Sequence, residues 1–156
     1  MSERRSPANR RDRRKSGVYA NLEQALTADF GMFARASYND GRNEIPSFTH
    51  VDRSPSGGFA LKGTMGERPK DTVGIGVTSN FLSRPHRDFL AAGGLGLLIG
   101  DGQLNYSPER AFKTYYKLNL SRSVDLTFDY QRVGDLGYNA DRGPVNVFGV
   151  RLHAEF

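Results

Sequence analysis

The 156-residue chain contains no cysteine and no tryptophan. The absence of cysteine excludes a disulfide framework, a thiolate zinc site and a thiol nucleophile. Long apolar runs are missing too, because no stretch approaches the ~18–20 residues that a membrane-spanning helix needs, and mean hydropathy is −0.57. These absences exclude a helical membrane protein. They do not exclude a membrane β-barrel, whose strands alternate lipid-facing and water-facing residues and therefore have a polar average.

Net charge is concentrated at the amino-terminal end. The formal net charge is +5, and residues 1–15 hold seven arginine and lysine residues against two acidic ones, so the rest of the chain is neutral. Because residues 1–15 show no apolar periodicity, we expect them to form a disordered basic tail ahead of a folded segment over residues 16–156.

Two functions are open to such a tail. A basic arm can bind nucleic acid or anionic lipid by releasing counterions. No aromatic residue is interleaved among these charges to stack on bases, which favours a solvated end and no nucleic-acid partner. The charges are followed by no apolar segment of about 7–15 residues, so the chain shows no secretory signal peptide.

An apolar/polar alternation with a period of two runs through the rest of the chain. It predicts about seven strands of roughly 10 residues, joined alternately by short turns and longer polar loops. The predicted strands cover residues 17–26, 30–39, 59–65, 72–81, 112–120, 124–131 and 148–156. Strands this long, with connections that alternate in length, indicate an outer-membrane barrel, because soluble sandwiches use strands of about 5–6 residues.

Two connecting segments have their own sequence signals. Residues 67–70 contain a proline and charged residues, and we expect a tight turn there. Residues 84–108 interrupt the alternation, and we predict a short helical turn over about 86–92 that ends at Gly93 and Gly94. A long ordered loop of this kind often carries function.

No motif predicts an active site or a cofactor site. Gly94, Gly96 and Gly100 have the wrong spacing for a nucleotide-binding loop, and no strand–turn–helix unit surrounds them. His86 lies beside Asp88, but neighbours on a loop rarely meet in catalytic geometry and no nucleophile elbow accompanies them. The three histidines are too widely spaced to suggest a metal site. We therefore expect neither an enzyme nor a cofactor.

Two carboxylates lie on the same face of one predicted strand. Asp125 and Asp129 share a face and could imitate a glycosidase pair. Lys113 and Lys117 occupy the preceding strand, so a cross-strand charge ladder is the preferred interpretation.

The hydrophilic residues of the alternating segments share one face. In a narrow soluble barrel this face would be buried, and each unpaired charge would cost several kcal/mol. Around a water-filled lumen the charges of this face stay hydrated, so their free-energy cost is small, and the face offers hydrogen-bond donors and acceptors to a polar solute. The residues predicted to line the pore and bind substrate are Glu23, Arg35, Lys62, Lys113, Tyr115, Lys117, Asp125, Asp129, Arg151, His153 and Glu155, with Asn119 and Gln131 on the same face.

Small and aromatic residues complete this pattern. Glycines on the polar face would widen the lumen locally or admit larger neighbours; they are Gly31, Gly74, Gly76 and Gly149. Aromatic residues near strand ends on the opposite face fit the girdles that barrels place at membrane interfaces. These aromatic residues are Phe30, Tyr38, Phe81, Phe112, Tyr130 and Phe156.

Several sequence blocks, in order along residues 16–156, carry a family resemblance. They are residues 21–24, 33–35, 39–42, 86–94, 100–106, 138–144 and 151–156. Together they resemble the carbohydrate-selective outer-membrane porins of Gram-negative bacteria. The resemblance implies an all-β fold: antiparallel up-and-down strands forming the C-terminal part, about seven strands, of a 16-stranded transmembrane β-barrel.

The resemblance also implies a function and partners. It implies passive, carbohydrate-selective diffusion of small sugars through a water-filled barrel in the cell outer membrane, surrounded by outer-membrane lipid. A terminal Phe156 on an alternating strand is similar to the signal that such barrels present to their insertion machinery.

Length separates this chain from the family it resembles, whose members are much longer and begin with a signal peptide. Seven strands at ~4.8 Å spacing give a sheet about 34 Å wide, whereas sixteen tilted strands need a girth of roughly 100 Å. We therefore expect an incomplete wall, the C-terminal portion of a porin from a truncated or misassigned reading frame. The alternative is a soluble β-barrel or lectin-like binding module with its apolar face inward and a basic tail that could bind nucleic acid.

Overall fold

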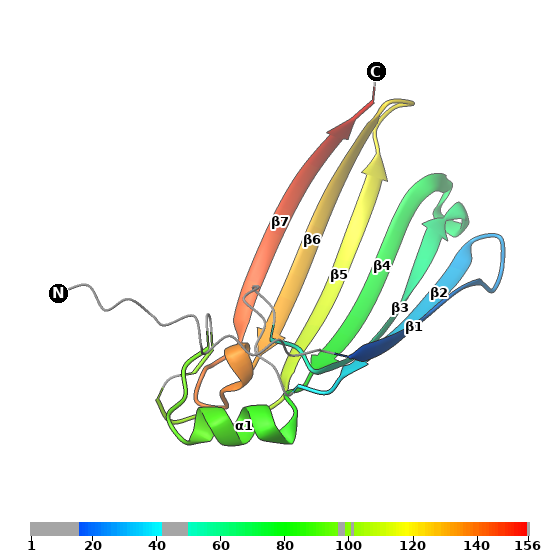
Figure 1. The fold of residues 1–156 in the computed structure, drawn as a ribbon. Helices are drawn as coiled ribbons and strands as arrows, with labels where there is room; N and C mark the ends of the chain where they lie inside the picture. The colour runs from blue at the N-terminus through cyan, green and yellow to red at the C-terminus, as the bar shows by residue number, and fades with distance from the viewer. Residues whose placement is uncertain (1–15, 42–49, 97–98, 101, 156) are drawn as a thin grey trace.

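The computed structural model of the chain describes residues 16–41, 50–96, 99–100 and 102–155. Seven antiparallel strands form one open sheet in sequence order (Figure 1). The strands are β1 (Gly17–Ala25), β2 (Phe30–Asn39), β3 (Arg53–Gly63), β4 (Arg68–Asn80), β5 (Glu109–Asn119), β6 (Val124–Gly134) and β7 (Val145–Ala154). The predicted all-β, up-and-down arrangement of about seven long strands is confirmed.

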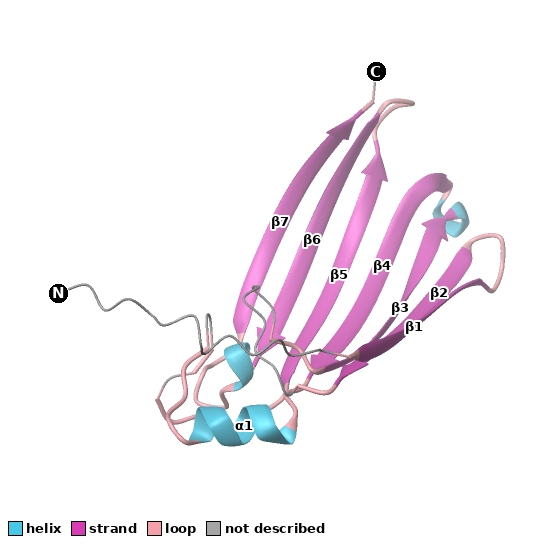
Figure 2. Ribbon diagram, in the orientation of Figure 1, coloured by secondary structure: helices cyan, strands magenta, loops and turns pink. Residues whose placement is uncertain are grey.

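Helices occupy little of the described chain (Figure 2). They are α1 (Arg84–Ala91) and the short 3-10 helices η2 (Thr64–Gly66) and η3 (Leu136–Tyr138). No helix in the described part of the chain has the length and apolar character needed to cross a membrane.

The two ends of the sheet carry connections of different length. At one end, residues 26–29, 64–67 and 120–123 make short turns, and we call this the turn end. At the other, the loop end, residues 40–52, 81–108 and 135–144 connect the strands (Figure 1). The predicted alternation of short and long connections is therefore confirmed. Parts of the first two long loops lie outside the described residues.

Two predicted boundaries in the β3–β4 hairpin are wrong. β3 begins at Arg53 rather than at residue 59, because its first residues lack apolar alternation and still pair with β2. Pro55 precedes the first residue that pairs with β4, so its missing N–H removes no bond from that ladder. The turn predicted at residues 67–70 lies instead at 64–67, where Glu67 adopts a left-handed φ of 61° and Arg68 already begins β4.

The helical turn predicted for residues 86–92 is present as α1, which begins two residues earlier. Ser83 caps it, because the Ser83 Oγ accepts a hydrogen bond of 3.3 Å from the backbone N–H of His86. Gly93 follows the helix with φ +90°, which confirms the predicted end. At the carboxyl end, β7 ends at Ala154, so Glu155 lies just past the strand. Phe156 and the predicted tail at residues 1–15 lie outside the described residues.

The strand register places the two classes of side chain on opposite faces, since directly opposed residues of a sheet share a face. One row across the last three strands joins Leu118, Leu126 and Leu152, and the next row joins Lys117, Thr127 and Arg151. We call these the apolar face and the polar face. The apolar face is uncovered: Val150 is 69% exposed and Leu152 67%.

The buried hydrophobic residues lie at the loop end, not against the sheet. The described residues of 50–52, 81–108 and 135–144 form a compact unit that we call the loop cap (Figure 1). Its core contains Leu82, Leu90, Ile99, Leu104 and Tyr138, with Tyr106 packed against it. The sheet therefore leaves its apolar face to the surroundings, and the loop cap has a small core of its own.

Candidate functional site

The predicted site residues lie on the polar face. The pairing registers bring ten of them to this one face from six of the strands, and Glu155 follows β7 on the same side of the alternation. They do not form one cluster. The residues of β1 and β2 lie apart from those of β5, β6 and β7, and the strands between contribute mainly glycine, serine and threonine to this face.

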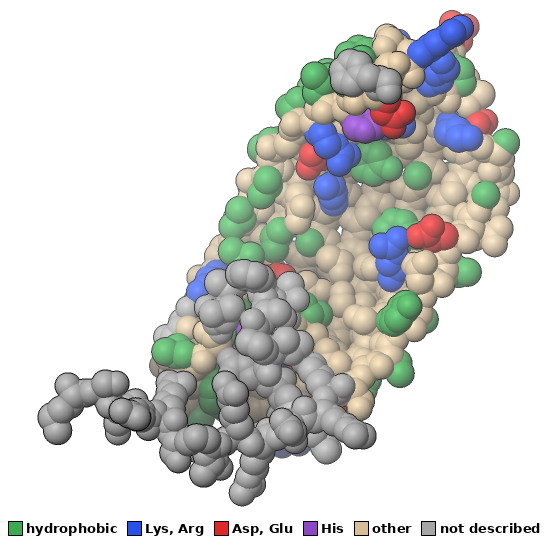
Figure 3. All heavy atoms as spheres, turned by 45° about the horizontal axis from the view of Figure 1, so that its top comes forward, with side chains coloured by type: hydrophobic (Ala, Val, Ile, Leu, Met, Phe, Trp, Pro, Cys, Tyr) green, Lys and Arg blue, Asp and Glu red, His purple; other side chains and the backbone are tan. Residues whose placement is uncertain are grey.

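The polar face is hollowed. A depression of about 710 Å³ runs over the middle of the sheet, and its lining includes Phe33, Lys113, Tyr115, Asp129 and Arg151. Figure 3 shows this hollow with charged side chains of both signs around it. Small residues of β3 and β4 form its floor.

Lysines and carboxylates pair between β5 and β6. The Lys113 Nζ lies 3.7 Å from the Asp129 Oδ1, and the Lys117 Nζ lies 3.6 Å from the Asp125 Oδ2. The Asn119 side-chain amide also donates a 2.8 Å hydrogen bond to Asp125. The predicted cross-strand charge ladder is confirmed. Each aspartate already faces a lysine, which is not the arrangement of a glycosidase pair.

Arg35 is held against β1. Its Nη2 lies 2.7 Å from the Glu23 Oε1, and its Nε donates a 2.8 Å hydrogen bond to the Asn21 side chain. Its guanidinium carbon also lies 5.3 Å from the centre of the Phe33 ring. A partly exposed arginine with this many partners has a defined position on the wall.

Glycines determine how two further side chains lie in the hollow. A Cβ placed on Gly74 would lie 2.1 Å from the Tyr115 Cε1, and one placed on Gly149 would lie 2.5 Å from the Asp129 Oδ2. The phenol ring and the carboxylate therefore rest directly on the backbone of the neighbouring strand. This confirms the expectation that glycines on this face admit larger neighbours.

The remaining predicted residues lie nearer the turn end or the sheet edge. Lys62 donates a 3.0 Å hydrogen bond to the carbonyl of Ala28, and the His153 Nε2 lies 3.8 Å from the Glu155 Oε1. Arg151 has no ion pair with the described residues, and it is among the residues that line the hollow.

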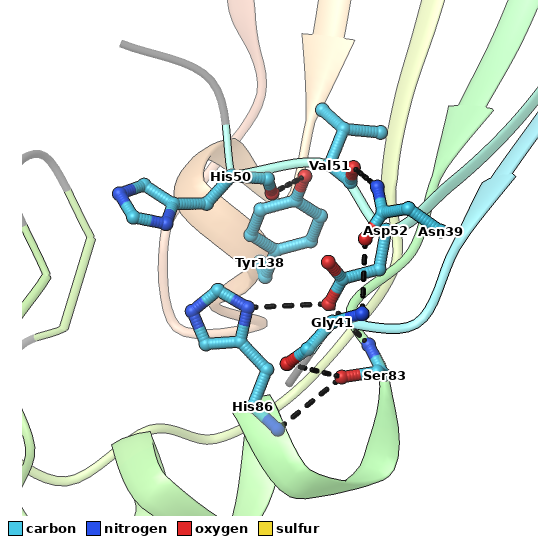
Figure 4. Close-up of polar contacts among 8 residues, drawn as sticks. All are labelled: Asn39, Gly41, His50, Val51, Asp52, Ser83, His86 and Tyr138. Atoms are coloured by element: carbon cyan, nitrogen blue, oxygen red, sulfur yellow. Dashed lines mark hydrogen bonds and ion pairs between the residues drawn. The ribbon is translucent and has the colours of Figure 1, made fainter. Parts of the chain in front are cut away.

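A buried polar network in the loop cap was not predicted. Asp52 is 1% exposed, and its Oδ2 accepts hydrogen bonds from the Ser83 backbone N–H at 2.7 Å and from the His86 ring at 3.2 Å (Figure 4). Burial by itself raises the pKa of Asp52, but the hydrogen bonds from His86 and Ser83 outweigh it and hold the pKa below its usual value. His86 thus pairs with a residue 34 positions away, while its neighbour Asp88 faces Arg84 at 3.9 Å.

Tyr138 closes the same network. Its hydroxyl donates a 2.6 Å hydrogen bond to the carbonyl of His50 (Figure 4). Burial raises the pKa of Tyr138, and the negative charges of Glu109 and Asp52 raise it further. Tyr138 therefore joins the third long loop to the first, and Asp52 joins the first to the second. These contacts between loops could not be predicted, because nothing in the local sequence marks the residues as partners. They form only when loops that are distant in the sequence come together.

A second buried carboxylate lies in β4, near the turn end. Asp71 is 2% exposed and accepts hydrogen bonds from the Arg68 guanidinium, from the Tyr116 hydroxyl and, at 2.9 Å, from the backbone N–H of Asn119. The sequence pattern did not predict this buried carboxylate either. Through its hydrogen bonds to Tyr116 and Asn119, Asp71 holds β4 against the end of β5. Asp71 therefore has a structural role.

Together, an open antiparallel sheet, a hollow polar face and an uncovered apolar face define a wall segment of a β-barrel. The family described as "Carbohydrate-selective porin, OprB family" matches residues 3–156. The chain belongs to this family, and the family's description names a channel rather than an enzyme.

A solved structure shows the same fold. The chain resembles the one titled "High pH structure of Pseudomonas putida OprB", with a TM-score of 0.73 and 19% sequence identity over 91% of this chain. The match covers 36% of that longer chain, so the present chain spans about a third of its length. No curated protein sequence gives a significant match.

Proposed function

We propose that the chain forms part of the wall of an outer-membrane pore through which small sugars diffuse passively. The single observation that supports this most is the placement of the two faces. The polar face is concave and hollow, and the apolar face is exposed with no layer of the described chain covering it. A soluble β-barrel or lectin-like module needs the reverse, with apolar side chains packed inside.

The apolar face fits outer-membrane lipid. Its aromatic residues include a contiguous group on β5, β6 and β7, in which the Tyr130 ring centre lies 6.4 Å from that of Phe112 and 5.1 Å from that of Phe148. Groups of aromatic rings are typical of the level where a barrel meets the lipid headgroups. We propose that this group forms part of an interfacial girdle.

The polar face fits a neutral, hydroxyl-rich solute. Its charges are largely paired with one another, as in the Lys113–Asp129 and Arg35–Glu23 pairs, so the wall presents alternating donors and acceptors with little net field. A sugar can exchange its water hydrogen bonds for these groups as it passes. We propose the eleven predicted residues, Glu155 included, as lining of the pore.

The unequal connections suggest an orientation. Outer-membrane barrels have short periplasmic turns and longer extracellular loops, so the turn end would face the periplasm and the loop cap the outside. A complete pore would have 16 strands, of which this chain supplies seven. Insertion machinery that recognises Phe156 would act at the periplasmic side.

The test is conductance of a barrel that contains this wall, reconstituted in a planar bilayer. We expect a steady ionic current that falls as glucose is added, because the sugar occupies the hollow and displaces ions. Lys113→Gln leaves Asp129 without its cation, so we expect selectivity to shift toward cations. The matched substitution Phe128→Leu on the apolar face should leave both properties unchanged. A current that ignores glucose and a panel of other sugars would contradict carbohydrate selectivity, and no current at all would contradict the pore.

A further inference from the structure

The apolar face carries positive charge at the loop end. The strand registers place three exposed arginines there, opposite residues of the neighbouring strands that share this face. They are Arg53 on β3, Arg110 on β5 and Arg132 on β6. No acidic residue of the described strands lies on the loop-end half of this face, so its charge is of one sign.

Arg110 and Arg132 lie close enough to act together. Arg110 is opposite Gly134 and Arg132 is opposite Phe112, so the two arginines are diagonal neighbours on β5 and β6. Diagonal neighbours on one face of a sheet lie about 7–8 Å apart, which is within reach of long side chains. Two like charges at this distance repel each other, and an anion between them removes the repulsion.

Neither arginine has an ion pair with the described residues. The carboxylates nearest to them in the sequence have other partners. Glu109 belongs to the opposite face, and its two oxygens accept hydrogen bonds of 3.1 and 2.9 Å there. Asp135 accepts a 2.8 Å hydrogen bond from the Ser107 hydroxyl. The described chain therefore supplies no counterion for Arg110 and Arg132.

A further donor and two aromatic rings adjoin the arginine pair. Asn146 is opposite Arg132, and its Oδ1 accepts a 2.8 Å hydrogen bond from the Tyr130 hydroxyl, which leaves the side-chain N–H groups as donors. Phe112 and Tyr130 belong to the aromatic group proposed above as part of an interfacial girdle. Each arginine lies two residues beyond one of these rings toward the loop end, about 7 Å along its strand. The pair is therefore placed at the level of lipid headgroups.

We propose that Arg110, Arg132 and Asn146 bind the phosphate of an anionic lipid headgroup in the bilayer leaflet on the loop side. A guanidinium forms paired, charge-assisted hydrogen bonds with phosphate oxygens. Arginine stems can also cover apolar surface while the charged heads reach the polar layer. The proposal rests on the proposed function, because such a headgroup is within reach only if the apolar face lies in a bilayer. It goes beyond that function, since the binding group lies outside the wall, away from the hollow.

A single introduced tryptophan can report which lipid contacts it, because the chain has none of its own. Phe148→Trp places the reporter on the apolar face beside Tyr130, and Leu152→Trp places a matched reporter on the same face of β7, nearer the turn end. The full chain with one reporter is reconstituted in phosphatidylcholine vesicles. A fixed fraction of the lipid carries bromine on its acyl chains and is either phosphatidylglycerol or phosphatidylcholine. Fluorescence quenching then gives the preference of the contacted site for the anionic headgroup.

With the Phe148→Trp reporter we expect phosphatidylglycerol to quench more than phosphatidylcholine. Arg110→Gln and Arg132→Gln should each lower this preference about fivefold, the usual contribution of one basic residue at an anionic membrane surface. Arg53→Gln is the matched control, because Arg53 lies two strands away from Arg110, and it should leave the preference nearly unchanged. The Leu152→Trp reporter should show no preference. Circular dichroism checks that each variant keeps its strand content, and the comparison of the two reporters needs no arginine variant.

Three outcomes would overturn the proposal while leaving the membrane wall intact. The first is equal quenching of the Phe148→Trp reporter by the two lipids. The second is an equal loss of preference with Arg53→Gln, since the attraction would then be spread along the whole loop end. The third is a preference that inorganic phosphate abolishes and potassium chloride of equal ionic strength does not, which would assign the site to a free phosphate ion. Absence of quenching of both reporters by either lipid would contradict the proposed function together with this inference.

Discussion

Single glycines control where functional side chains lie on the hollow face. The Tyr115 ring occupies the space that a side chain on Gly74 would fill, and the Asp129 carboxylate does the same over Gly149. Glycine in a strand interior weakens the strand by itself but permits a close approach of this kind. The depth of the hollow at these positions therefore depends on two residues that offer no hydrogen-bonding side chain to a solute.

Gly74→Ala should therefore displace the Tyr115 ring. We expect it to lower the free energy of unfolding by about 1–3 kcal/mol, the usual penalty for overpacking. In a Tyr115→Ala background the same change should have little effect, because the obstructing ring is gone. Urea unfolding in detergent micelles measures both. Gly134→Ala is the control, since a Cβ there meets no atom within 4 Å. An equal loss in the two backgrounds would disprove the contact.

At the scale of elements, the loop cap is stabilised differently from the strands. The strands are joined by ladders between sequence neighbours, whereas the cap depends on a small apolar core and on the buried carboxylate of Asp52. Since the pKa of Asp52 is lower in the folded cap than its ordinary value of 3.8, its ionised form is the stabilising one. This contribution is present above pH 3.8 and is lost as the pH falls through the lower, folded pKa.

We therefore expect the cap to open as the pH is lowered below about 4. Asp52→Asn should weaken the cap at neutral pH, because the amide is a poorer acceptor for Ser83 and His86, and should remove most of the acid-induced loss. Hydrogen exchange of the α1 amides as a function of pH measures this. Asp88→Asn, an exposed residue of the same helix, should keep the wild-type profile. Identical profiles for Asp52→Asn and the wild type would show that Asp52 does not hold the cap.

The described part of the molecule is a wall with two different faces. Apolar side chains such as Val150 point away from the concave face, and charged neighbours such as Arg151 point into it. Outer-membrane barrels place such an apolar face against hydrocarbon and such a polar face against water, and the proposed function predicts the same surroundings here.

Labelling of single-cysteine variants tests these surroundings directly. In lipid vesicles we expect Leu118→Cys and Val150→Cys to react with a reagent confined to hydrocarbon. Lys113→Cys and Arg151→Cys should react with a water-soluble thiol reagent, and the cysteine-free parent is the background. The reverse pattern would mean that the faces are assigned to the wrong surroundings.

The sequence by itself determined most of the strands, their two faces and the presence of a charge ladder between the lysines of β5 and the aspartates of β6. These depend on a two-residue period and on hairpins between sequence neighbours, which are local properties of the chain. It also predicted α1 and the glycine that ends it. The start of β3 and the turn at residues 64–67 were not predicted correctly. Pro55, Pro69 and the glycines of that hairpin break the apolar alternation, while the backbone still pairs.

Only the tertiary structure decided which distant residues meet. Asp52 contacts His86 across 34 positions, and Asp71 contacts Asn119 across 48. Such pairs form when long loops or separate hairpins close, and local periodicity carries no information about that closure. The common direction of β1 and β7 was likewise settled by the number of strands that paired.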